Sequence, residues 1–102
     1  MLELRPNCEL CDTDLPPQSA AARICTYECT FCARCVEHHL GDVCPNCGGG
    51  FQPRPIRPRG EWRPGHGLAH DPPGTERRRS RRTRDQIAAL TECLRSIPPG
   101  ER

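Results

Sequence analysis

Eight cysteine residues gather in the first half of the chain, at spacings that suit the binding of metal ions. They follow the pattern C-x2-C-x13-C-x3-C-x2-C-x2-C-x8-C-x2-C and are Cys8, Cys11, Cys25, Cys29, Cys32, Cys35, Cys44 and Cys47. A C-x2-C turn directs two sulfur atoms at one metal ion, and four thiolates fill a tetrahedral zinc site. The spacing therefore predicts about two zinc ions, each in an all-cysteine site.

Disulfides and redox chemistry are the other uses of clustered thiols. No basic segment followed by an apolar run opens the sequence, so we expect no secretory signal peptide. No stretch approaches the ~18–20 apolar residues of a membrane span. We therefore expect a cytoplasmic protein without membrane association, whose thiols stay reduced and bind metal. A thioredoxin-like redox couple needs a βαβ context, for which this segment is too short.

The eight spacings resemble those of a RING finger, a zinc fold of the cross-brace, treble-clef type. The resemblance implies that one zinc ion is held by Cys8, Cys11, Cys32 and Cys35. It implies that the second is held by Cys25, Cys29, Cys44 and Cys47, with Cys29 in the place of the usual histidine. Residues 1–58 resemble more closely a family of short bacterial cysteine-rich proteins of unknown function.

Other assignments of the ligands stay open at this point. A sequential pairing joins the first four cysteines in one site and the last four in another. A single zinc ion held by Cys8, Cys11, Cys44 and Cys47, as in a ribbon with spare thiols, also fits the spacing. His38 could replace one cysteine, although a solvated histidine at the end of a helix is the simpler interpretation.

The RING resemblance implies a contact that the rest of the sequence supports poorly. RING ubiquitin ligases grip their conjugating enzyme with an aliphatic residue in the first knuckle, and Leu10 matches that position. The second loop, VEHHLGDV, has no tryptophan, and Gly48 to Gly50 stand where a basic residue is wanted. A ligase-like adaptor that uses Leu10 as a partner contact is therefore only a second alternative.

The elements that must position the cysteines form a small domain at residues 1–52. Only eleven large apolar side chains lie in this segment, so the sequence predicts a metal-stabilised α+β fold. Residues 23–27 favour a short strand, and with it a hairpin. Residues 33–40 predict a short helix, because Val36 and Leu40 share one face and Gly41 can end it.

The remainder of the chain divides into two segments. Residues 53–76 contain many prolines and glycines, which predicts an extended or disordered linker. Residues 77–102 combine an arginine-rich run with a C-terminal amphipathic helix. In that helix Thr83 and Gln86 have the spacing of a capping box. Ile87, Leu90, Leu94 and Ile97 fall on one face before Pro98.

Charge separates the two halves of the chain. Three arginines against seven acidic residues give residues 1–52 a charge of −4, and twelve arginines against six acidic residues give residues 53–102 a charge of +6. The basic run consists of Arg77, Arg78, Arg79, Arg81, Arg82 and Arg84. This run predicts either a basic tail that folds back on the acidic module or a site for nucleic acid or another polyanion.

These observations favour a non-enzymatic protein. Sites made only of cysteine are closed, whereas catalytic zinc sites keep an open position for water. No histidine or carboxylate stands beside such a position in the sequence. We expect a structural zinc module that contacts another protein, as an interaction or regulatory adaptor without a small-molecule substrate. The alternative is a nucleic-acid-associated regulator that uses the Arg77–Arg84 run.

Overall fold

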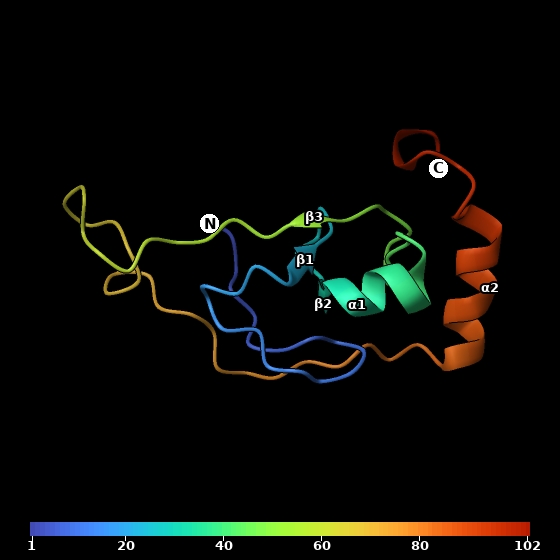
Figure 1. Ribbon diagram of the computed structural model, residues 1–102, viewed down its shortest axis with the longest axis horizontal. Helices are drawn as coiled ribbons and strands as arrows, with labels where there is room; N and C mark the ends of the chain where they lie inside the picture. The colour runs from blue at the N-terminus through green and yellow to red at the C-terminus, as the bar shows by residue number, and fades with distance from the viewer.

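The computed structural model describes residues 1–102 and shows two groups of elements joined by a long extended segment (Figure 1). The first group consists of β1 (Ala22–Ile24), β2 (Thr30–Cys32), α1 (Ala33–Cys35), η1 (Val36–Leu40) and β3 (Gln52–Pro53). The second consists of α2 (Arg84–Leu94) and η2 (Pro99–Glu101). None of the helices has the length and apolar character needed to cross a bilayer.

A three-stranded antiparallel sheet lies at the centre of the first group, in the order β2-β1-β3. The predicted hairpin is confirmed as β1 and β2, with Ala22 opposite Cys32. The strand ends earlier than predicted, because Glu28 turns the chain with a φ of 65° and donates its N–H to the Cys25 carbonyl. The edge strand β3, which the sequence did not predict, pairs with β1.

The predicted helix over residues 33–40 is confirmed, with one change of type. α1 continues directly into η1, which has π-helical geometry. Gly41 ends the helix in the left-handed conformation, with a φ of 55°, as the sequence predicted. Beneath it, Phe31 and Phe51 pack edge to face with ring centroids 5.5 Å apart, and both belong to the core.

The segment from residue 54 to residue 83 contains no regular element but is tied to the first group. The linker predicted at residues 53–76, extended or disordered, lies within this segment apart from its first residue. The guanidinium of Arg57 donates to the Leu2 carbonyl at 2.7 Å, and the N–H of Gly74 donates to the Leu4 carbonyl at 3.0 Å. Polar contacts hold this segment where apolar side chains are few. After a loop at one end of the molecule, the segment runs back beside the N-terminal segment (Figure 1).

α2 begins with the capping box that the sequence predicted. Thr83 Oγ1 accepts from the N–H of Gln86 at 3.1 Å, and the Gln86 side chain accepts from the N–H of Thr83 at 2.9 Å. The helix docks on η1 through Ile87, its one buried residue, and through the Thr91 hydroxyl, which donates to the Leu40 carbonyl. The second group is therefore packed against the helix of the first.

Candidate metal centres

One group of four cysteines surrounds a common point in the first half of the chain. The Sγ atoms of Cys8, Cys11, Cys32 and Cys35 all lie within 4.8 Å of one another. The first two come from a loop near the N-terminus, and the other two from the end of β2 and the end of α1. The strand and helix therefore meet the loop at this group, which we call the first cluster.

A second group lies where the β1–β2 hairpin meets the loop after η1. The Sγ atoms of Cys25, Cys44 and Cys47 lie within 4.8 Å of one another. Cys29 is buried, and its carbonyl accepts a hydrogen bond from the N–H of Cys25 at 3.2 Å. We call these four residues the second cluster, in which three thiols converge and the fourth lies alongside.

The two clusters interleave along the chain. The first and third cysteine pairs make the first cluster, while the second and fourth pairs make the second. A sequential pairing would unite Cys8 with Cys25, which the structure keeps in separate groups. A ribbon with one metal would unite Cys8 with Cys44, and these also lie in separate groups.

Similar turns present the cysteines of the two outer pairs. In the N-terminal loop the N–H of Asp12 donates to the Cys8 carbonyl, and in the later loop the N–H of Gly48 donates to the Cys44 carbonyl. Both donors have a positive φ, 67° for Asp12 and 81° for Gly48. Each loop is thus a tight turn that closes one residue after its second cysteine.

Within each cluster the thiol pKa values are pushed in opposite directions. Burial acts to raise the pKa of Cys11, but hydrogen bonds from Thr13 outweigh it and lower this pKa to about 6. Burial raises the pKa of Cys35. The hydrogen bond shared with Cys44 lowers the pKa of Cys29 to about 5 and raises the pKa of Cys44. A metal ion that enters either cluster must therefore displace protons.

The donor set and its spacing fit a tetrahedral metal ion. Bonds of about 2.3 Å from zinc to sulfur set neighbouring sulfurs of a tetrahedron about 3.8 Å apart. The Sγ atoms of Cys11 and Cys32 lie 3.8 Å apart. All nine cysteines of the chain are free thiols, so none of the cluster sulfurs is committed to a disulfide.

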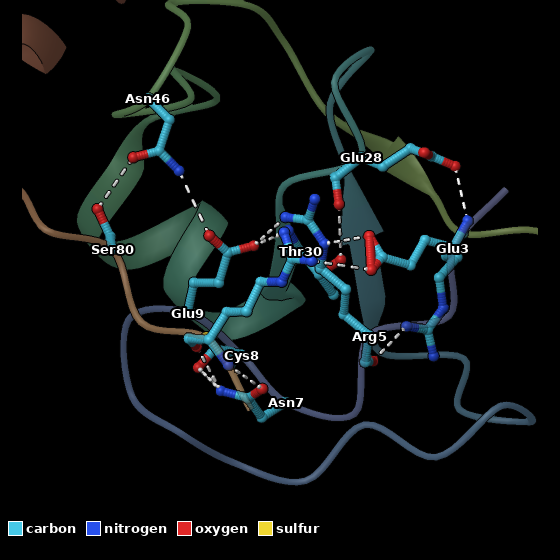
Figure 2. A network of polar contacts seen from close by, with 11 residues as sticks. Glu3, Arg5, Asn7, Cys8, Glu9, Glu28, Thr30, Asn46 and Ser80 are labelled. Carbon is cyan, nitrogen blue, oxygen red and sulfur yellow. Dashed lines mark hydrogen bonds and ion pairs between the residues drawn. The ribbon is translucent and has the colours of Figure 1, made fainter. Parts of the chain in front are cut away.

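The buried carboxylate of Glu9 links the turns that carry the two clusters, a role that was not predicted (Figure 2). It accepts hydrogen bonds from the N–H of Thr30 at 2.6 Å, from Arg5 at 2.9 Å and from Asn46 at 3.4 Å. Glu9 lies in the Cys8–Cys11 turn, and Asn46 lies in the Cys44–Cys47 turn. The only available signal was a carboxylate between two closely spaced cysteines, which is too common to assign a role.

Several other residues singled out in the sequence lie outside the clusters. His38 is exposed at the end of η1 and belongs to neither group of metal-binding side chains. Leu10 has only 7% of its surface exposed and packs in the core. The resemblance to RING ligases implied that Leu10 contacts a partner, and that contact stays a prediction.

The arginine run divides into two halves. Arg77 and Arg78 form ion pairs with acidic residues of the N-terminal segment, and Arg79 donates to the Leu10 carbonyl at 2.9 Å. The remaining three, Arg81, Arg82 and Arg84, are exposed and have no carboxylate within 4.0 Å. The structure therefore brings half of the predicted polyanion-binding residues against the acidic module.

Comparisons with known proteins identify the part of the chain that carries the clusters. The family described as "Protein of unknown function (DUF1272)" matches residues 1–57. The chain is 67% identical over 58 residues to "Uncharacterized protein R02474" of Rhizobium meliloti (strain 1021). That similarity covers 57% of this chain and 69% of the relative. No solved structure matches the chain.

Proposed function

Because this chain belongs to the DUF1272 family of proteins of unknown function, and the matched segment contains all eight clustered cysteines, we propose that residues 1–57 form a structural zinc module that serves in protein contact. The match agrees with the resemblance to short bacterial cysteine-rich proteins. Each of two zinc ions would be held by one cluster, with Cys29 completing the second. The interleaved grouping of the thiols carries this proposal.

The chemistry of the donors supports zinc as the metal. Thiolate sulfur is a soft ligand, and four thiolates in a tetrahedron select zinc over the harder magnesium and calcium ions. A structural zinc ion contributes an apparent ~10–16 kcal/mol to the folding of small domains. The module has a small apolar core, so this contribution decides whether it folds. Reduced thiols are required, which agrees with a cytoplasmic protein.

A structural role is favoured over a catalytic one by the surroundings of the clusters. Four sulfur ligands leave no open position for water or substrate on a tetrahedral zinc ion. The carboxylate of Glu9, which lies between the clusters, already accepts three hydrogen bonds. It therefore acts as a brace and not as a general base.

Metal analysis of the purified chain tests the proposal. We expect about two zinc ions per chain, with one lost in each of the variants Cys32→Ser and Cys44→Ser. Cys93→Ser is the matched control, because Cys93 is an exposed cysteine on α2, outside both clusters. A wild-type chain that folds without metal would overturn the proposal, as would zinc loss in the control.

Nucleic-acid binding is a second candidate, and the exposure of Arg81, Arg82 and Arg84 favours it. With three arginines available, the slope of log affinity against log salt for duplex DNA should be about −3, rather than about −5 for the full run. Replacing these three by alanine should abolish binding, whereas replacing Arg77–Arg79 should leave it intact. Equal losses in the two triple variants would exclude this division of the run.

A further inference from the structure

Residues 77–80, which we call the strap, lie along the N-terminal segment of the zinc module. The N–H of Gly74 donates to the Leu4 carbonyl, and the N–H of Ser80 donates to the Glu9 carbonyl at 2.9 Å. Residue numbers therefore rise together in the two segments, which run in the same direction. Figure 1 shows the strap beside the N-terminal segment, on its way to α2.

The main chain of the strap is held by the side-chain amide of Asn7. Asn7 Nδ2 donates to the Arg78 carbonyl at 2.7 Å, and the N–H of Arg78 donates to Asn7 Oδ1 at 3.1 Å. Asn7 is fully buried and is fixed by further hydrogen bonds to Cys8 and Asp12. These two hydrogen bonds recognise the peptide backbone of residue 78 and do not depend on its side chain.

The surface of the module that the strap covers is called the groove below. The side chains of Arg77 and Arg79, on either side of Arg78, show that this groove accepts arginine. The guanidinium of Arg77 donates to Asp12 Oδ1 and, at 2.6 Å, to both the Asp12 carbonyl and Asp14 Oδ1. Arg79 donates to the Leu10 carbonyl. Alternate residues of an extended chain point to the same side, so Arg77 and Arg79 face the module together.

The far end of the strap reaches the second cluster. The Ser80 hydroxyl donates to Asn46 Oδ1 at 3.1 Å, and Asn46 in turn donates to Glu9 (Figure 2). A polar cavity of about 730 Å³ remains between the strap and the module, lined by residues that include Glu9, Asn46 and Arg81. The strap therefore spans both cysteine turns without filling the space beneath it.

The groove and its occupant come from different parts of the chain. The residues that hold the strap, Asn7, Asp12, Asp14 and Asn46, lie within the family segment at residues 1–57, while the strap lies beyond it. From this arrangement we propose that the groove is a docking site for an extended, arginine-containing segment of a partner protein. The strap is then an intramolecular competitor that occupies the groove until the partner displaces it.

The contacts suit an exchangeable occupant. Arg77 has 44% of its side chain exposed and Asp14 has 81%, and ion pairs at such positions are weak and screened by salt. The occupant is retained mainly because it is tethered, which gives it a local concentration on the order of millimolar. A partner segment with the same arginine pattern and additional contacts in the cavity can displace it.

Peptide binding to the full-length, zinc-loaded chain tests this inference, which rests on the proposed zinc module. The probe is a fluorescein-labelled peptide with the sequence of residues 75–83. The double variant Arg77→Ala, Arg79→Ala weakens the strap and leaves the groove intact. We expect this variant to bind the peptide at least tenfold more tightly than the wild-type chain, as measured by fluorescence anisotropy.

Two further variants make the result specific. The double variant Arg82→Ala, Arg84→Ala removes the same charge at two exposed positions outside the cavity, so it should bind like the wild type. Adding Asp14→Asn to the strap variant should weaken binding again. If the strap variant loses its zinc, Ser80→Pro, which removes the hydrogen bonds from Ser80 to Glu9 and to Asn46, takes its place.

Each outcome has a distinct meaning when zinc content is measured on the same samples. Equal binding by the two double variants would mean attraction by charge alone and would overturn the docking site. Zinc-loaded protein that fails to bind the peptide would overturn it as well, while the proposed zinc module would stand. A folded chain without zinc would instead overturn the proposed function. The inference would also be rejected if the Arg77→Ala, Arg79→Ala variant bound duplex DNA in place of the peptide.

Discussion

At the scale of single residues, Arg54 shows how the chain compensates for its small core. Only 4% of this residue is exposed, and its guanidinium donates to the carbonyls of Arg5, Leu15 and Pro16 at 2.9–3.1 Å. Burial lowers the pKa of this arginine. One side chain thus joins the residue after β3 to two parts of the N-terminal segment.

We expect Arg54→Ala to lower the free energy of unfolding of the zinc-loaded chain by about 2–3 kcal/mol, because buried carbonyls lose their donors. Urea unfolding followed by circular dichroism measures the change. Arg59→Ala is the matched control, since Arg59 is exposed. It should change stability by less than about 0.5 kcal/mol. Equal effects of the two variants would refute this role for Arg54.

Which residues could be predicted follows from how far away their partners lie in the sequence. The role of the eight cysteines can be predicted from their local spacing, and all eight lie in the two clusters or beside them. The roles of Asn7 and Arg54 cannot be predicted in this way, because their hydrogen-bond partners lie 71 and 38–49 positions away in the sequence. A sequence pattern carries no record of such contacts.

At the scale of elements, α2 is held in the fold by the buried side chain of Ile87 and by the hydrogen bond from Thr91 to Leu40. It has eleven residues, which is too short for a stable helix alone in water. Ile87 is its one buried residue, with 4% exposure, whereas Leu90 and Leu94 on the same face are half-buried. The capping box fixes where the helix begins, and Ile87 fixes where it packs.

Ile87→Ala should therefore release α2 from η1 while the cysteine-containing module at residues 1–57 stays folded. Loss of a buried isoleucine costs about 2–5 kcal/mol, which exceeds the stability of a helix of this length. Hydrogen exchange should show faster exchange of the α2 amides and unchanged exchange in β1 and β2. Ile56→Ala, at a position with 55% exposure, should leave both regions unchanged. Faster exchange throughout the chain would instead mean that the two groups fold as one unit.

The helices were predicted well because their ends are marked by local chemistry. Gly41 and the pair Thr83 and Gln86 act within one turn of the chain, so the sequence shows them directly. β3 was missed because it is two residues long and contains Pro53, without any alternation of apolar residues. The surface on which α2 docks was also not predicted, since an amphipathic face does not identify the surface that covers it.

At the scale of the whole molecule, two oppositely charged halves lie against each other. The half with a charge of +6 returns along the half with a charge of −4, and the arginines of the strap meet its carboxylates. Eight thiolates and two zinc ions would add a charge of −4 to the acidic half and strengthen this attraction. The radius of gyration is 14.5 Å, close to the roughly 13 Å of a compact domain of this length.

Removal of the metal should therefore expand the entire chain. We expect the radius of gyration to rise from near 14.5 Å toward about 30 Å, the value of an unfolded chain of this length, when a chelator is added. Small-angle X-ray scattering before and after chelation measures the change. Cys93→Ser should behave as the wild type does in both states. A radius that stays constant on chelation would show that the fold does not depend on metal.

The hydrogen bonds of Ser80 have a consequence for how the strap is aligned. Arginines occur at positions 77, 78, 79, 81 and 82, so a shift of the strap by two residues would place Arg79 and Arg81 where Arg77 and Arg79 now lie. Asn7 would grip the backbone equally well after such a shift. The bond from Ser80 to Asn46, together with the ion pair between Arg78 and Glu3, distinguishes one alignment from the next. Ser80 therefore contributes to the register of a segment in which every other residue from 77 to 82 is arginine.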